Sequence, residues 1–239
     1  TGGNVQKGQQ VIIQAELDQP EFVYMLVQEC YRCGAEKVTV EWNYQPLTKL
    51  NVQYQKLKTL SQVPQWQQAK LAERTEKLPV MIYLVSEDPD GLNGINQVKL
   101  AKAQQARYSI IKPYRDKMEN KYQWCIAAVP GAAWARKLFP SLRTSAAIEK
   151  LWEAILHASR ADNDDPIAAW SKHNADLEAR CAYLNAHNIE TLVYKSKNGT
   201  DLRVGLIENA VFMGGGERSL QGVFYNPNIP TEEVFITPM

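Results

Sequence analysis

A continuous apolar run, Pro79–Val85, constrains the fold of this chain more than any other segment. Runs of this length without polar alternation are typical of strands that are buried on both faces, as in a parallel sheet. Three further β-rich runs, Gln10–Ala15, Lys37–Trp42 and Gln123–Val129, are separated by stretches with helical periodicity. Four strand–helix alternations predict an α/β fold with a doubly wound, mostly parallel sheet.

The segment after the first run predicts both ends of a helix. Asp18–Glu21 has the order of a capping box, with Asp18 as the N-cap residue and a proline and a glutamate in the first turn. Gly34 ends the predicted helix. The preceding loop, Glu16–Gln19, contains no glycine, so the phosphate-binding fingerprint of dinucleotide sites is absent. We therefore expect no nicotinamide or flavin cofactor.

Polar residues dominate positions 46–77, and Pro64 divides them into two predicted helices, 47–60 and 65–77. Beyond the apolar run, Ser86–Gly91 places three acidic residues at the carboxyl end of a strand, where open α/β sheets usually bind ligands. The same residue types, Asp, Pro and Gly, also form turns. We favour the turn as the interpretation of this loop.

A change of pattern after residue 187 predicts a domain boundary. Two β-rich runs, Glu190–Lys197 and Thr200–Leu206, flank Asn198-Gly199, which is the strongest short hairpin signal. We therefore predict an α/β N-terminal domain over residues 1–187 and the β-rich start of a second domain over residues 188–239. A unit of about fifty residues seldom buries enough apolar surface to be stable alone. This second domain is accordingly expected to be truncated, with further chain as its missing partner.

The end of the chain holds the densest run of unusual chemistry. Three glycines, Gly214–Gly216, and two prolines, Pro227 and Pro230, predict a rigid, irregular loop. This loop delivers two adjacent carboxylates, Glu232 and Glu233, to the start of a Val-Phe-Ile strand. Because adjacent strand residues point to opposite faces, only one of the two can face a given site. Carboxylates there can bind a divalent cation, accept an amine or face water, and their chemistry leaves these alternatives open.

The run Asn226–Phe235, with its two prolines and two glutamates, resembles a motif of the aminopeptidase T family of metallopeptidases. Asn198–Leu206, which contains Thr-Asp-Leu, stands upstream at a fitting distance. The resemblance implies that Glu232 or Glu233 is the first ligand of a site for two divalent metal ions, zinc, cobalt or manganese. In that family the site removes N-terminal amino acids from peptides. Which of the two glutamates is the ligand stays open.

The resemblance also implies that residues 188–239 begin the catalytic domain of the family, and it implies what this chain lacks. The remaining ligands of the family, a second glutamate, histidines and an aspartate, would lie beyond Met239, and no catalytic residue can be assigned. The chain then corresponds to the N-terminal portion of an aminopeptidase and is inactive by itself. Peptides are the implied substrates, and a homodimer is the implied assembly.

Composition narrows the range of partners. A net charge of +1 gives no field that would attract nucleic acid, and no apolar run reaches the length of a membrane span. The N-terminus has no secretory pattern, so we expect a cytoplasmic protein without nucleic-acid or membrane partners. An alternative from another class is a non-catalytic α/β domain that binds a ligand or dimerises. A longer gene product with further histidines and aspartates would favour the enzyme, and a natural stop after Met239 would favour the binding domain.

Overall fold

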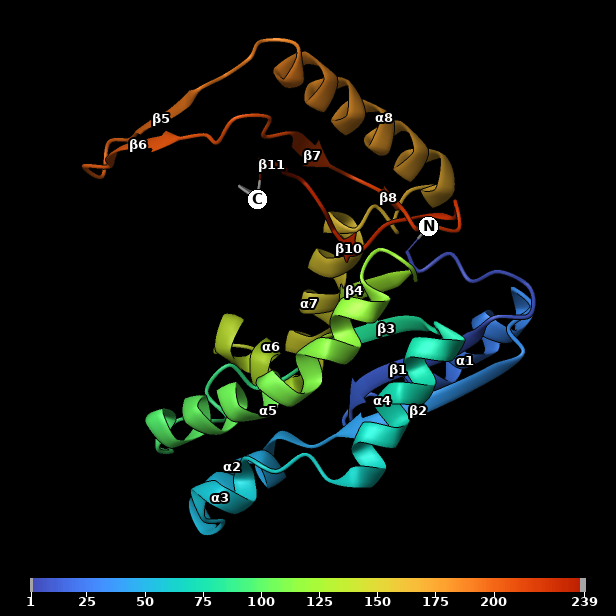
Figure 1. Ribbon diagram of the computed structural model, residues 1–239, viewed down its shortest axis with the longest axis vertical. Helices are drawn as coiled ribbons and strands as arrows, with labels where there is room; N and C mark the ends of the chain where they lie inside the picture. The colour runs from blue at the N-terminus through green and yellow to red at the C-terminus, as the bar shows by residue number, and fades with distance from the viewer. Residues whose placement is uncertain (1, 237–239) are drawn as a thin grey trace. The chain divides into compact units, whose positions relative to one another are not determined.

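The computed structural model describes residues 2–236, and its first part is built on a five-stranded sheet (Figure 1). The strands are β1 (Gln10–Glu16), β2 (Lys37–Asn43), β3 (Val80–Val85), β4 (Trp124–Ala128) and β10 (Asn228–Ile229). Their order is β10-β4-β3-β1-β2, and every neighbouring pair is parallel. The predicted α/β fold with a parallel sheet is confirmed.

Helices cover both faces of this sheet. The helices along the chain are α1 (Pro20–Arg32), α2 (Gln45–Tyr54), α3 (Leu57–Leu60), α4 (Gln65–Lys77), α5 (Gln97–Met118), α6 (Ala132–Leu138), α7 (Thr144–Ala158) and α8 (Pro166–Asn185). Phe22 of α1 and Trp152 of α7 pack on one face, with 5.3 Å between their ring centroids. Helices α4 and α5 contact each other on the opposite face, so the sheet is doubly wound as predicted (Figure 1). None of the described helices is both long and apolar enough to cross a membrane.

The apolar face of the sheet forms the core of this part. Alternate residues of β1 and β3, among them Val11, Ile13 and Ile82, are buried against α1. Side chains alternate between the two faces along a strand, so the residues between them point to the other face. Full burial of one aliphatic side chain contributes about 1.5–3 kcal/mol, so these few positions hold the sheet and the helix together.

Helix α1 begins later than the capping pattern predicts. Its N-cap is Gln19, which makes no side-chain cap hydrogen bond, and Pro20 occupies the first turn. The predicted cap, Asp18, instead accepts a hydrogen bond from Ser86 Oγ at 2.9 Å. The prediction of Asp18 as the N-cap was therefore wrong, because a partner that is distant in the sequence binds its carboxylate.

The single helix predicted over 47–60 is in fact two helices, α2 and α3, with extended backbone at Gln55 and Lys56. Lys99 Nζ donates a hydrogen bond at 2.5 Å to the carbonyl oxygen of Val52, in the last turn before the break. That carbonyl therefore has a partner from outside the helix, and α2 can end there without an unsatisfied acceptor.

The later part of the chain contains short antiparallel pairs. Strands β5 (Thr191–Lys195) and β6 (Asp201–Gly205) form the hairpin that Asn198-Gly199 predicts, and Gly199 has a left-handed φ of 96°. Strand β7 (Phe212–Gly214) pairs with β11 (Val234–Ile236), and β8 (Glu217–Arg218) pairs with β9 (Phe224–Tyr225). The predicted β-rich region is confirmed.

Contacts divide the chain into two compact units. The first comprises residues 1–159 and 217–229, and the second comprises residues 160–216 and 230–239. Residue 1 and residues 237–239, at the ends of these ranges, lie outside the described residues. The first unit includes a segment from late in the chain, which ends in the edge strand β10. This division follows from how densely the residues contact one another, and it does not test whether either part folds by itself. The domains 1–187 and 188–239 therefore stay a proposal.

Limited proteolysis is expected to yield a stable core that ends near His187. The first cleavages should fall in the β5–β6 hairpin, because every residue of β6 is exposed. Mass spectrometry of the resistant fragments measures the boundary. Rapid cleavage within residues 10–130 would contradict an independently folded N-terminal domain.

Gly214 allows β7 and β11 to approach closely, since a Cβ atom added at this position would lie 2.8 Å from the carbonyl oxygen of Glu233. We expect Gly214→Ala to lower the free energy of unfolding by about 1–3 kcal/mol, because the backbone before β11 must shift. Gly205→Ala in β6 is the matched control, since nothing lies within 4 Å of a Cβ added there. Urea denaturation measures both variants, and equal losses would refute the close-approach argument.

Candidate functional site

The two glutamates proposed as metal ligands, Glu232 and Glu233, lie in the loop that immediately precedes β11, as the sequence predicts. Both side chains are exposed, whereas the preceding residue, Thr231, is only 4% exposed. The loop therefore combines one buried anchor with two carboxylates that are open to solvent.

His173 of α8 holds the loop through this buried anchor. Its Nε2 atom lies 2.5 Å from the carbonyl oxygen of Thr231. Because a carbonyl oxygen only accepts hydrogen bonds, Nε2 carries the proton in this pair. The ring also packs edge-on against Trp170, with 5.7 Å between the centroids. Sequence reasoning missed this role, because the two partners are 58 residues apart and no motif joins them.

Arg160 engages both carboxylate oxygens of Glu232. Its guanidinium donates hydrogen bonds at 2.6 Å to Oε1 and at 3.1 Å to Oε2. The hydrogen bonds from Arg160 are the largest cause of the lowered pKa of Glu232. Arg160 has left-handed backbone with φ of 58°, and its guanidinium carbon lies 5.9 Å from the centroid of the Trp170 ring. The same tryptophan thus contacts both residues that hold the loop.

Glu233 has a different environment from its neighbour. Its Oε2 atom accepts a hydrogen bond from the Glu232 backbone N–H at 3.0 Å. Within residues 2–236, its Oε1 atom has no hydrogen-bond or ion-pair partner. The Glu232 carboxylate is therefore paired with the Arg160 guanidinium, whereas the Glu233 carboxylate presents an oxygen to solvent.

A carboxylate of this loop is suited to serve as one ligand of a divalent cation. Carboxylate oxygen is an ordinary ligand of zinc and manganese. In the part of the chain that the structure describes, no group of three or more His, Cys, Asp or Glu side chains could hold a metal ion. The loop is therefore suited to supply one ligand to a metal site whose other ligands come from elsewhere. The described residues do not form a complete site by themselves.

The acidic loop Ser86–Gly91 borders a crevice of about 490 Å³ near the carboxyl ends of the strands. Gln45 fixes this loop, since its amide donates to the Asp88 carbonyl oxygen and accepts from the Asp88 N–H, both at 3.1 Å. Asp90 forms an ion pair with Lys137 at 2.7 Å. These partners support the interpretation of the loop as a turn.

Comparisons with known proteins agree over nearly the whole chain. The family described as "Thermophilic metalloprotease (M29)" matches residues 1–239. Aminopeptidase T of Thermus thermophilus is 37% identical over 238 residues, which are 99% of this chain and 58% of that protein. Aminopeptidase 2 of Geobacillus stearothermophilus is 36% identical over 99% of this chain and 57% of that protein. Aminopeptidase AmpS of Bacillus subtilis is 34% identical over 99% of this chain and 58% of that protein.

A solved structure, wild-type AmpT from Thermus thermophilus, matches this chain with a TM-score of 0.87 and 34% sequence identity. The match covers 99% of this chain and 58% of that chain, so the present chain spans less than two thirds of the relatives' length. These findings confirm the resemblance that the Pro-Thr-Glu-Glu run indicates. The chain belongs to the M29 family of thermophilic metalloproteases.

Proposed function

We propose that this chain is part of a metal-dependent aminopeptidase that removes N-terminal amino acids from peptides through a two-metal site. The observation behind the proposal is the loop before β11, where His173 holds the backbone, Arg160 holds the Glu232 carboxylate, and the Glu233 carboxylate stays open to solvent. Relatives named aminopeptidases match 99% of the chain, which supports peptides as the substrate class. Divalent ions in such a site polarise the scissile carbonyl and activate a water molecule for attack.

In this proposal Glu233 is the metal ligand and Glu232 is a positioning residue. Glu233 offers Oε1 to a cation, while the Glu232 N–H orients its Oε2. Carboxylates that bind metals are commonly oriented by such hydrogen bonds. The Glu232 carboxylate already pairs with the Arg160 guanidinium. A metal ion bound to the same carboxylate would lie close to this guanidinium, and the two positive charges would repel each other. The motif leaves the two glutamates equivalent, and the geometry favours Glu233.

The other ligands are proposed to come from the part of the relatives that this chain does not cover. Two ions about 3.5–4 Å apart need more donors than one carboxylate supplies. Zinc, cobalt and manganese all accept carboxylate and imidazole ligands, so each is compatible with the proposal. A homodimer belongs to the same proposal, because β5 and β6 form a two-stranded sheet whose outer edges could pair with another chain.

The two glutamates are predicted to respond differently to substitution in the full-length gene product. Glu233→Gln should lower kcat/KM for leucyl p-nitroanilide by at least about a hundredfold, because a neutral amide is a poor metal ligand, whereas Glu232→Gln should lose about tenfold or less. Zinc affinity from calorimetry should follow the same order. Thermal unfolding of both variants controls for folding, and the opposite order would assign the ligand to Glu232.

The 239-residue chain alone is expected to hydrolyse no aminoacyl substrate when zinc, cobalt or manganese is added, because the described residues hold no three-ligand group. The measurement is chromogenic release from leucyl p-nitroanilide, with and without chelator. Chelator-sensitive turnover by this chain would contradict the prediction. Inactivity of the full-length product as well would favour the alternative, a non-catalytic α/β domain for ligand binding or dimerisation.

A further inference from the structure

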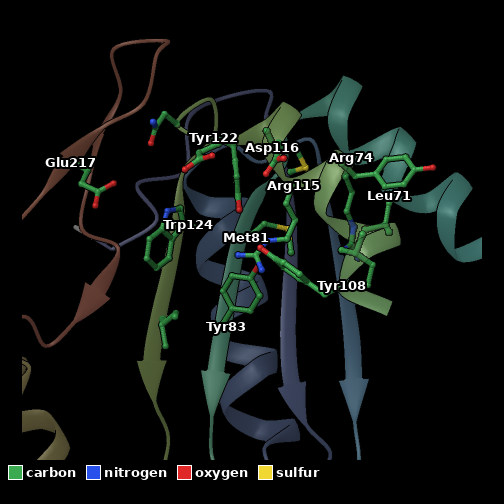
Figure 2. Close-up of a pocket in the computed structure, with 16 residues that line it drawn as sticks. Leu71, Arg74, Met81, Tyr83, Tyr108, Arg115, Asp116, Tyr122, Trp124 and Glu217 are labelled. Atoms are coloured by element: carbon green, nitrogen blue, oxygen red, sulfur yellow. The ribbon is translucent and has the colours of Figure 1, made fainter. Parts of the chain in front are cut away.

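A cavity of about 710 Å³ lies within the first unit, between helices α4 and α5 and the second face of the sheet (Figure 2). Strand β3 contributes Met81 and Tyr83 to its lining, and β4 contributes Trp124. The lining includes no residue of the loop before β11 and none of the acidic loop after β3. Neither the loop of Glu232 and Glu233 nor the acidic loop therefore accounts for this cavity.

Arg115 of α5 supplies a positive charge to the cavity. Figure 2 shows its side chain reaching from the helix towards Tyr83. Within the described chain its guanidinium forms no ion pair, and its central carbon lies 5.9 Å from the centroid of the Tyr108 ring. A guanidinium that faces such a space without a carboxylate partner is well suited to bind an anion.

Arg74 of α4 adds a second guanidinium to the lining. Its terminal nitrogen pairs with Glu41 of β2, but its Nε atom is buried and has no hydrogen-bond partner among the described residues. An unsatisfied buried donor costs on the order of 1–3 kcal/mol. Arg74 therefore adds positive charge to the wall of the cavity, while its buried Nε atom has no partner among the described residues.

Two phenols lie beside the guanidinium groups. Tyr83 and Tyr122 interact through their hydroxyl groups, and both also interact electrostatically with Arg74 and Arg115. Burial raises the pKa of Tyr83 to about 12 and also raises the pKa of Tyr122. Both phenols are therefore neutral near pH 7. Because one hydroxyl donates to the other, one O–H of the pair remains to donate to a ligand.

The rest of the lining is largely aromatic and apolar, with Trp124, Tyr108 and Leu71 among its members. Offset or edge-on contacts between aromatic rings contribute about 0.5–1.5 kcal/mol beyond burial of their area. A ligand with a planar ring would therefore gain more here than an aliphatic one of equal size.

The lining contains three acidic groups, and each interacts with another described residue. Glu119 interacts electrostatically with Lys112. Asp116 pairs with Lys112 at 2.5 Å, and Glu217 accepts a hydrogen bond from the Tyr225 hydroxyl at 2.9 Å. They are therefore less able to compete with a ligand for Arg115.

We propose that this cavity binds a small aromatic carboxylate, with its carboxylate between Arg115 and Arg74 and its ring beside Trp124. A guanidinium donates two parallel hydrogen bonds to a carboxylate, which fits Arg115, and Arg74 adds a second positive charge to the wall. The volume lies within the range of about 300–1,000 Å³ that is typical of small-molecule sites. This inference does not depend on the proposed peptidase activity.

Calorimetric titration of the 239-residue chain with phenylpropionate tests the proposal. Phenylpropionamide, which has the ring without the charge, and propionate, which has the charge without the ring, are the matched probes. Phenylpropionate should bind at least about tenfold more tightly than either, because it alone satisfies the guanidinium groups and the aromatic wall together. Absence of phenylpropionate binding, or equal affinity for the amide, would overturn the proposal.

Substitution of Arg115 tests the site itself. Arg115→Gln should weaken phenylpropionate binding at least about tenfold. Arg32→Gln on α1 is the control, since Arg32 is exposed and pairs with Glu29 away from the cavity, and it should bind as the parent chain does. Circular dichroism checks that each variant is folded. If Arg115→Gln does not fold, Arg115→Lys keeps the charge but loses the planar fork and should still weaken binding severalfold. Unchanged affinity in a folded Arg115 variant would refute the site.

Discussion

The first unit depends on the burial of one face of its parallel sheet. Val11, Ile13 and Ile82 are at most 7% exposed, and they lie on neighbouring strands that pair in register. Because side chains alternate along a strand, burial of this face determines which residues point the other way. Glu41 of β2 and Tyr83 of β3 therefore face α4 and α5 as a consequence of the apolar core. The chemistry of the second face follows from the packing of the first.

Charge pairing holds that second face together. Burial by itself raises the pKa of Glu41, but hydrogen bonds from Arg74, Lys70 and Gln14 outweigh this effect and lower the pKa to about 2. The ionised carboxylate ties α4 to β2 and, through Gln14, to β1. Long polar side chains fill space less completely than interdigitated aliphatic ones, and the large cavity lies at this face. The Glu41 network thus fixes α4 on this face, and Arg74 belongs both to that network and to the lining of the cavity.

Sequence reasoning succeeded where the structural signal is local. The apolar run of β3 and the Asn198-Gly199 turn each depend on residues within a few positions of one another. Strand β10 could not be predicted, because two residues carry no periodicity and their partner, β4, lies far earlier in the chain. The N-cap prediction for Asp18 failed for a related reason, since Ser86 is distant in the sequence. Local patterns predict elements, whereas tertiary partners decide how individual side chains are used.

The candidate site likewise combines a local sequence signal with contacts to residues that are distant in the sequence. The Pro-Thr-Glu-Glu run identifies the family and the two carboxylates, because it is contiguous in the sequence. It cannot separate Glu232 from Glu233, because the difference comes from Arg160, 72 residues away from Glu232, and from His173, 58 residues away from Thr231. These partners fix the loop and leave Oε1 of Glu233 unengaged within residues 2–236. Two adjacent residues of one type thereby acquire different chemistry, since a guanidinium neutralises one carboxylate while the other keeps an oxygen available for a cation.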